Sequence, residues 1–249
     1  MYPKYSYPRG LFARVALDAI LLRHRNFRLD AKACIENLHP SLKVLGEENI
    51  PQRGPCVITV NHYHRKGFGA EWLALAIASV VPTDMHWAMT GEWTYPGKWY
   101  APLGAKYSRF ILHLLARAYG FTSMPPMPPR PKDVEARAKS VRAVLDVVRH
   151  TKEPVLGLAP EGYDSPNGVL SSPPGGVGRF GLLLVNVGLQ FVPVGAYESD
   201  GEFVVHFGKS YQLNIPRGLS SDEKDFQAAQ IIMGHIAQLL PSHLRGEFA

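Results

Sequence analysis

The sequence is poor in cysteine and in charged residues. It holds only two cysteines, Cys34 and Cys56, among 249 residues, which excludes a disulfide framework and favours a reducing compartment. Charged residues make up 19% of the chain and hydrophobic residues 46%, a composition that excludes wholesale disorder. Glycine and proline follow no repeat, which excludes a fibrous protein. The length fits one large domain, at most with a short appendage.

The sequence also lacks a clear membrane-spanning segment. Its longest uncharged run, residues 180–197, is interrupted by polar residues and Pro193, so we interpret it as a helix that leads into a buried strand. The apolar stretch at residues 11–22 contains Arg14 and Asp18, and no small-residue cleavage site follows it. We therefore do not expect a signal peptide.

Positive charge is concentrated near the N-terminus. The formal net charge is +6, and residues 1–30 carry six cationic side chains against two acidic ones. A basic arm of this kind suits nucleic acid or an anionic membrane surface. No cluster of basic and aromatic residues appears in the rest of the chain. We therefore expect an anionic membrane surface as a partner and no nucleic acid.

Residues 9–25 are expected to form an amphipathic helix. Arg14, Asp18 and Arg25 fall within about 40° of one another around such a helix, and the remaining sides are apolar. The helix either packs on the core of the protein or lies in a membrane surface, where anionic lipid would attract its cations. We expect residues 1–39 to form a basic amphipathic helical arm that precedes a domain at residues 40–249.

Predicted strands and helices alternate after residue 40. Such alternation is typical of a layered α/β fold with a mostly parallel sheet flanked by helices. The segment 122–131 contains five prolines and is expected to be irregular. The expected strands span 41–45, 56–60, 86–90, 154–159, 191–196 and 202–207, and the expected helices span 71–81, 107–119, 133–150, 179–186 and 222–240.

Polar residues follow two of the predicted buried strands. Asn61, His62, Tyr63 and His64 come after the strand at 56–60, and the segment 160–165 follows the strand at 154–159. Ligands in open α/β sheets bind beyond the carboxyl ends of strands. A histidine placed there, just ahead of a helix N-terminus, is kept neutral and is suited to act as a base. A capping or merely exposed histidine would give the same local pattern.

The order of three short motifs resembles the PlsC-type glycerolipid acyltransferases, which include 1-acylglycerol-3-phosphate acyltransferase. The motifs are Asn61-His62, then Pro160-Glu161-Gly162 with Ser165, and then Val192-Pro193-Val194, and the resemblance covers about residues 40–248. It implies a glycerolipid acyltransferase-like fold and a place in phospholipid biosynthesis.

The reaction implied by this resemblance is transfer of a fatty acyl group from acyl-CoA or acyl-ACP to a hydroxyl of a lysolipid or lipid precursor, with His62 as general base. The thioester is a co-substrate and no cofactor is bound. Glu161 and Gly162 would shape the acceptor pocket. The full set of expected substrate-binding residues is Asn61, His64, Glu161, Gly162, Tyr163, Asp164 and Ser165. An acyl chain also needs an apolar groove, with candidate lining residues Leu73, Ile77, Phe110, Ile111 and Leu114.

The sequence departs from the family pattern at charged positions. The family aspartate of N-H-x4-D falls on Gly67, and the threonine and arginine of F-P-E-G-T-R-S fall on Tyr163 and Asp164. The family arginines hold the phosphate of the acceptor, whereas Asp164 would repel it. Candidate substitutes are Arg130, Lys132 and Arg179. The acyl-transfer chemistry therefore carries over more directly than a phosphate-bearing acceptor.

Glu71 is the candidate for the carboxylate that orients His62, since it begins the apolar helix at 71–81 as the family aspartate begins its own helix. Residues 63–69 must then form a loop, because a continuous helix would carry Glu71 about 13 Å along the axis and to the opposite side. Glu71 is equally explained as a carboxylate favoured at a helix N-terminus. His64 is another possible partner of His62.

Other functions fit the altered motifs. The chain could be a catalytically inactive acyltransferase-like protein that binds lipid or a partner protein, or a thioesterase that uses water as acceptor. A metal site is not expected, because His62-x-His64 has no nearby cysteine or helical i, i+4 pair. The absence of a G-x-S-x-G motif disfavours a serine hydrolase. We expect a cytoplasmic protein that is peripheral on the inner face of a membrane.

Overall fold

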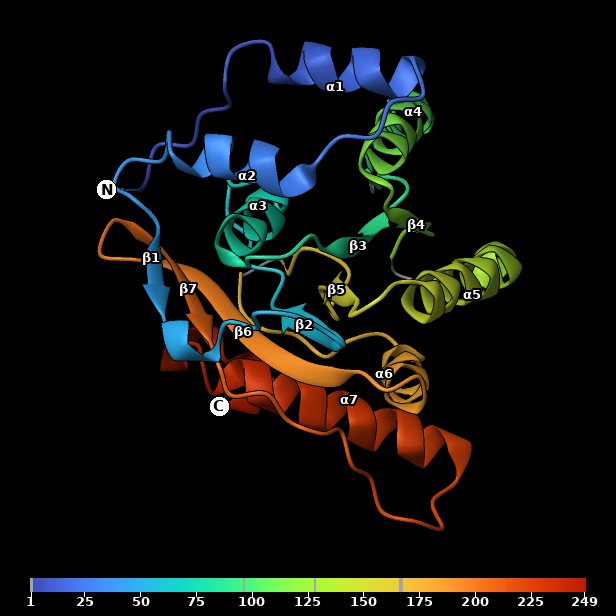
Figure 1. The fold of residues 1–249 in the computed structure, drawn as a ribbon. Helices are drawn as coiled ribbons and strands as arrows, with labels where there is room; N and C mark the ends of the chain where they lie inside the picture. The colour runs from blue at the N-terminus through green and yellow to red at the C-terminus, as the bar shows by residue number, and fades with distance from the viewer. Residues whose placement is uncertain (1, 96, 128, 166–167) are drawn as a thin grey trace.

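Seven strands of the computed structural model form one sheet, in the order β1-β7-β6-β2-β5-β3-β4 (Figure 1). The structure describes residues 2–95, 97–127, 129–165 and 168–249. Within them the strands are β1 (Lys43–Leu45), β2 (Cys56–Val60), β3 (His86–Thr90), β4 (Thr122–Met124), β5 (Val155–Leu158), β6 (Gln190–Ser199) and β7 (Glu202–Phe207).

Neighbouring strands run parallel except for β6 and β7. These two form a hairpin whose two connecting residues, Asp200 and Gly201, have φ angles of 53° and 84°. Two positive φ angles are typical of the turns whose twist matches that of a hairpin. The central strand β2 is buried at all five positions, as its β-branched composition predicts. The expected α/β fold class with a mostly parallel sheet is therefore confirmed.

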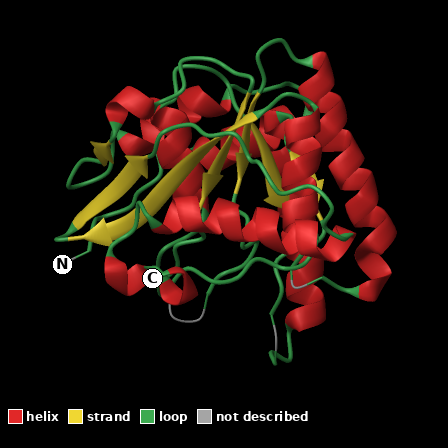
Figure 2. Ribbon diagram, turned by 90° about the horizontal axis from the view of Figure 1, so that it is seen from below, coloured by secondary structure: helices red, strands yellow, loops and turns green. Residues whose placement is uncertain are grey.

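Helices cover both faces of the sheet. In Figure 1, α2 and α3 lie on one face, α6 and α7 lie on the other, and α1 packs on α4. The view from below in Figure 2 shows helices in front of the twisted strands. The helices are α1 (Leu11–Ile20), α2 (Phe27–Ile35), α3 (Glu71–Val80), α4 (Ala101–Tyr119), α5 (Val134–His150), α6 (Val177–Asn186) and α7 (Ser221–Ala237).

The helix expected at 9–25 is shorter in the structure, because α1 ends at Ile20, and a second helix, α2, follows outside the expected range. The chain leaves α1 through Leu22, whose φ of 61° is left-handed, and α2 begins where the Asn26 side chain accepts a hydrogen bond from the Leu29 N–H. Arg25 lies between the helices and forms ion pairs with Asp18 of α1 and Asp30 of α2. Arg25 therefore joins two helices, rather than continuing a polar stripe along one.

The segment expected to be irregular at 122–131 begins with a strand. Residues 122–124 form β4, which pairs with β3 in parallel. The prolines start only at Pro125, so these first three residues keep the N–H groups that a sheet needs. Position 128 of the same segment lies outside the described residues. Helix α4 also starts earlier than expected, because Pro102 lies in its first turn, where proline is tolerated.

Two helical glycines test the packing of α6 on α7. A Cβ at Gly178 of α6 would lie 1.9 Å from the backbone oxygen of Asp225, whereas a Cβ at Gly234 of α7 would meet no atom within 4 Å. We expect Gly178→Ala to lower the free energy of unfolding by about 1–3 kcal/mol, because the helices must move apart. Gly234→Ala should raise it by about 0.5–1 kcal/mol, because alanine restricts the unfolded chain. Urea unfolding of the two variants measures both changes, and equal effects would contradict this packing.

Candidate functional site

The carboxyl ends of β2 and β5 lie side by side, because these strands are hydrogen-bonded neighbours with Thr59 opposite Leu158. The segments that follow them contain His62 and residues 160–165. The structure therefore brings together the two groups of polar residues that the sequence places after strands. They lie at the carboxyl edge of the sheet, where α/β folds bind ligands.

Asp164 lies between two histidines in this site. Its Oδ1 atom is 2.9 Å from Nδ1 of His62, and its Oδ2 atom is 3.3 Å from Nδ1 of His64. The His62 side chain is 17% exposed and the Asp164 side chain is 50% exposed, so the pair lies at the surface end of the site. A carboxylate thus lies beside His62, and it belongs to Asp164, which was expected to bind substrate.

The contact between His62 and Asp164 is close but not well aligned. Nδ1 of His62 is buried, and among the described residues it has no aligned hydrogen bond despite the 2.9 Å separation. The proximity of His62 is the main cause that lowers the pKa of Asp164, partial burial opposes it, and the charge of His64 adds to the lowering. Asp164 is therefore an anion at neutral pH that can stabilise a positive charge on either ring.

Glu161 holds the backbone of the histidine segment in place. Its side chain is buried, and Oε1 accepts a hydrogen bond of 2.6 Å from the His62 N–H. Oε2 accepts bonds of 3.0 Å from the N–H and the hydroxyl of Ser171. Burial raises the pKa of Glu161, and these hydrogen bonds partly oppose the rise. Both carboxylate oxygens accept hydrogen bonds from the protein, so Glu161 fixes the backbone position of His62.

The other residues of the 160–165 segment shape the turn. Gly162 adopts a left-handed φ of 70°, and a Cβ there would lie 2.9 Å from Cγ of Met127, so this residue must stay small. Ser165 is buried and Tyr163 is partly buried. Because Met127 lies next to Gly162, the proline-rich segment after β4 covers the turn at residues 161–164.

Asn61 anchors the end of β2 to β6. Its side-chain amide donates to the Ala196 carbonyl at 2.8 Å and accepts from the Ala196 N–H at 2.7 Å. The residue is buried, and this pair of bonds engages both ends of the amide. Asn61 therefore fixes the point at which the chain leaves the sheet, and with it the backbone position of the next residue, His62.

Glu71 does not lie beside His62 as expected. It occupies the first turn of α3, and its Oε1 accepts a hydrogen bond of 2.5 Å from the hydroxyl of Tyr7. The residues between His62 and α3 do form a loop, in which Gly67 has a left-handed φ of 84°. The loop does not return Glu71 to the ring, and the carboxylate beside His62 comes from the loop after β5 instead.

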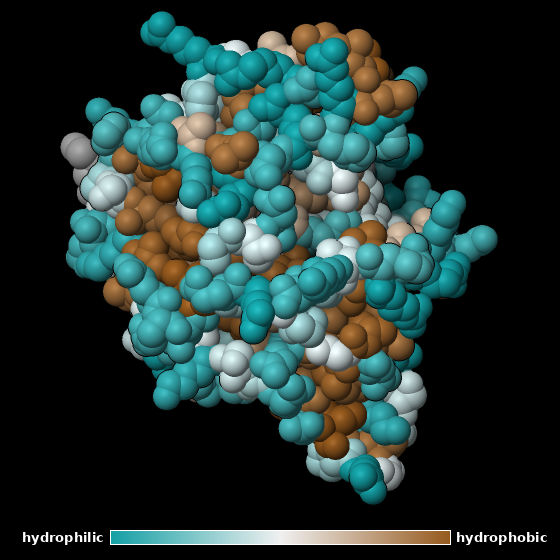
Figure 3. All heavy atoms as spheres, in the orientation of Figure 1, coloured by the Kyte–Doolittle hydropathy of each residue, from teal (hydrophilic) through white to brown (hydrophobic). Residues whose placement is uncertain are grey.

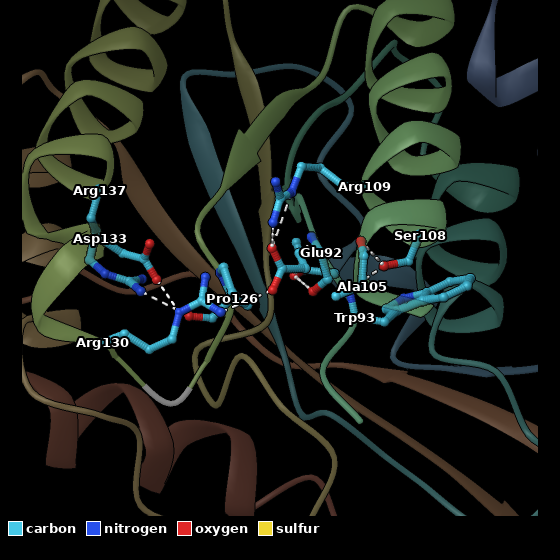
Figure 4. Close-up of polar contacts among 10 residues, drawn as sticks. Glu92, Trp93, Ala105, Ser108, Arg109, Pro126, Arg130, Asp133 and Arg137 are labelled. Atoms are coloured by element: carbon cyan, nitrogen blue, oxygen red, sulfur yellow. Dashed lines mark hydrogen bonds and ion pairs between the residues drawn. The ribbon is translucent and has the colours of Figure 1, made fainter. Parts of the chain in front are cut away.

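A second charged cluster lies beyond the ends of β3 and β4 (Figure 4). The buried carboxylate of Glu92 accepts from Arg109 at 2.5 Å and from Arg130 at 2.9 Å, and Arg130 also bonds to Asp133. Arg137 donates to the Pro126 carbonyl at 3.0 Å. The cluster cross-links the chain after β3, helix α4 and the start of α5. Arg130, a candidate to replace a family arginine, is thus already paired with two carboxylates.

No pattern in the sequence indicates this cluster, because its partners are separated by 17 and 38 positions. Of the other candidate substitutes, Arg179 lies 3.6 Å from Asp225. Within the part of the chain that the structure describes, no group of three or more histidine, cysteine or acidic side chains has the arrangement of a metal site.

Comparison with models of known protein families found no match, and comparison with curated proteins found none either. Among solved structures, the chain is similar to the 1-acyl-sn-glycerophosphate (LPA) acyltransferase PlsC from Thermotoga maritima. The two share 14% sequence identity with a TM-score of 0.48, and the match covers 91% of this chain and 88% of that chain.

The lowered pKa of Asp164 can be measured residue by residue. We expect NMR titration of its carboxyl group to give a pKa below the ordinary value of 3.8, and His62→Gln to raise it more than His64→Gln does. Because the pKa is lowered in the folded protein, this contact stabilises the fold above the ordinary pKa, and the contribution is lost as pH falls through the lowered value. A pKa of 3.8 or more in the unmodified protein would show that the histidines do not act on Asp164.

Proposed function

We propose that this protein transfers a fatty acyl group from an acyl-CoA or acyl-ACP thioester to a hydroxyl of a lysolipid or lipid precursor. The observation that carries the proposal is the placement of His62 at the carboxyl edge of the sheet, 2.9 Å from the Asp164 carboxylate. A histidine held against a carboxylate is the arrangement of a general base. The identity of the donor as a thioester is inferred from the resemblance of the motifs to those of PlsC-type acyltransferases.

In the proposed reaction His62 takes the proton from the acceptor hydroxyl as its oxygen attacks the thioester carbonyl carbon. The carbon–sulfur bond then breaks, and the leaving thiolate takes that proton from the imidazolium, so the thiol departs and the base is restored. Asp164 stabilises the imidazolium, and Glu161 fixes the backbone of His62. A positioned base of this kind contributes about 10²–10⁴-fold to the rate.

Asp164 also bears on the choice of acceptor. It carries a negative charge next to the base, and Arg130 is engaged by Glu92 and Asp133. An acceptor with a phosphate beside its reacting hydroxyl would be repelled by Asp164. We therefore favour an acceptor whose reacting hydroxyl lies away from a phosphate, or which has none.

We further propose that the protein is peripheral on an anionic membrane, which would give it access to lipid. Helix α1 packs on the protein through Leu11, Val15 and Ala19, while apolar side chains on its other sides are exposed. Figure 3 shows an apolar patch over the end of α1 (brown, top right). The exposed apolar residues of α1, α4 and their flanks are Phe12, Leu17, Ile20, Leu21, Leu22, Trp99, Tyr100, Leu103, Tyr107 and Phe110.

The same helices also carry exposed cationic side chains, including Arg14 on α1 and Lys106 on α4. Apolar faces bordered by cations bind the interface of anionic membranes. Among the described residues, no helix has the length and apolar character needed to cross a bilayer. Phe110, a candidate for the acyl groove, is exposed on α4, whereas Leu73 and Ile77 lie in the core.

The catalytic proposal is tested by incubating the protein with long-chain acyl-CoA or acyl-ACP and a panel of lysolipids with and without phosphate. We expect acyl-lipid product, a loss of about 10²–10⁴-fold in kcat for His62→Ala, and a smaller loss for Asp164→Asn. The control His150→Ala changes an exposed histidine at the end of α5 and should leave the rate unchanged. Release of free fatty acid alone would indicate a thioesterase, and absence of both products would indicate a non-catalytic lipid- or partner-binding protein.

The membrane proposal is tested with sedimentation of vesicles that contain or lack anionic lipid. The double variant Leu17→Ser, Ile20→Ser removes two exposed apolar side chains of α1, and we expect its binding to anionic vesicles to weaken by about tenfold or more. Phe226→Ser is the matched control, because Phe226 is an equally exposed apolar residue on α7. Unchanged binding of the double variant would remove α1 from the membrane surface.

A further inference from the structure

The segment at residues 2–7 contacts the loop that carries the two histidines of the site. This N-terminal segment contains Tyr2, Tyr5 and Tyr7, and it passes beside α2 before it turns to α1 (Figure 1). We call residues 62–70 the histidine loop. Tyr2 contacts Arg65 of this loop, and Tyr7 contacts Glu71 in the first turn of α3. Tyr5 contacts Glu198, a residue of β6 that binds the loop.

Glu198, near the end of β6, is the centre of the first set of contacts. Its side chain is only 2% exposed. It pairs through both oxygens with the guanidinium of Arg65, and it accepts hydrogen bonds from Tyr63 at 3.1 Å and from Tyr5 at 2.7 Å. The ring of Tyr2 covers the same guanidinium at 3.9 Å. Two residues of the loop and Tyr5 of the N-terminal segment therefore meet at one buried carboxylate, and Tyr2 covers the arginine bound to it.

The second set of contacts lies at the other end of the loop. The Tyr5 ring packs on Phe68 and Trp72, with ring centroids 5.3 Å and 5.0 Å apart. The Tyr7 ring stacks on Trp72 at 4.8 Å, and its hydroxyl donates to Glu71. The N-terminal segment thus holds both the start of the histidine loop and the start of α3.

The loop depends on these contacts because it has little internal structure. It contains no helix or strand, and Gly67 and Gly69 increase its freedom. Loss of the Tyr5 hydroxyl would leave the buried Glu198 with one donor fewer, which is costly for a buried charge. Burial raises the pKa of both Tyr5 and Tyr7, and their carboxylate partners raise it further. Both hydroxyls therefore stay protonated and remain donors.

We propose that residues 2–7 form a strap that holds the histidine loop in its reactive arrangement, so that Tyr5 and Tyr7 are positioning residues. The part of this inference that concerns catalysis rests on the acyl transfer proposed above. Their hydroxyls bond to Glu198 and Glu71 and not to His62 or Asp164. Each acts through the loop, by fixing the backbone from which His62 and His64 reach Asp164.

The test compares Tyr5→Phe, Tyr7→Phe and the double variant with Tyr119→Phe. The control removes a similar partly buried hydrogen bond, since the Tyr119 hydroxyl donates to Asp30 at 2.9 Å, between α4 and α2. Hydrogen–deuterium exchange of residues 62–70 is the first readout. We expect exchange there to speed up by about tenfold in the double variant, and not in the control.

The second readout is the separation of kcat from KM for acyl transfer. A displaced base slows the chemical step, so we expect the double variant to lose about 10- to 100-fold in kcat with little change in KM for the thioester. Unchanged exchange at 62–70 would overturn the strap. Faster exchange with unchanged kcat would overturn the positioning role. If the wild-type protein shows no acyl transfer, the proposed function fails while exchange still decides whether the strap exists. If the double variant does not fold, the single variants are judged by the same criteria.

Discussion

The parallel pairing of β2 with β5 is the constraint on which the site depends. It brings the residues after both strands to the same edge of the sheet, although they are about a hundred positions apart in the chain. The buried Glu161 carboxylate then joins the two segments through the His62 N–H. Without this bond, the residue that bears the imidazole would be held only by its neighbours in the chain, Asn61 on one side and a glycine-containing loop on the other. The pairing of β2 with β5 brings the two segments close together, and the buried Glu161 carboxylate fixes their relative positions.

The pKa values of two carboxylates three positions apart, Glu161 and Asp164, shift in opposite directions. Burial raises the pKa of Glu161, whereas the contact with His62 lowers the pKa of Asp164. Glu161 is enclosed by backbone and hydroxyl donors, and Asp164 faces two imidazoles from the surface. Separation of pKa values between neighbouring acids is a common way to divide structural and chemical tasks in a site. Here the buried acid positions the histidine, and the exposed acid can respond to its charge.

Local sequence patterns predicted most of the fold and the segments that form the candidate site. The β-branched run at 56–60 and the apolar run at 154–159 mark strands because burial on both faces demands such residues. The early end of α1 and the separate helix α2 were missed, because they depend on Asn26 as a cap and on Arg25 bridging two helices. The short strand β4 was missed because the adjacent prolines dominate the composition of its segment.

The partner of His62 could not be deduced from spacing. Glu71 is close in sequence and begins a helix, but its direction depends on Tyr7, a residue 64 positions away. Asp164 is remote in sequence, and its approach to His62 follows from the neighbouring strands and the Gly162 turn. The cluster around Glu92 was invisible for the same reason, since its members come from three separate segments. Long-range partners are set by the fold, and a single sequence contains no signal for them.

The location of the tyrosines in residues 2–7 has a practical consequence for handling the protein. A tag or fusion partner attached directly ahead of Tyr2 would lie next to Arg65. It would crowd the Tyr2 ring that covers the Arg65 guanidinium. Residues 244–247 pack on the segment that binds Glu161, because Glu247 accepts a hydrogen bond from the Ser172 N–H and the adjacent Ser171 donates to Glu161. A purification handle ahead of Tyr2 is therefore best removed by proteolysis before any rate is measured.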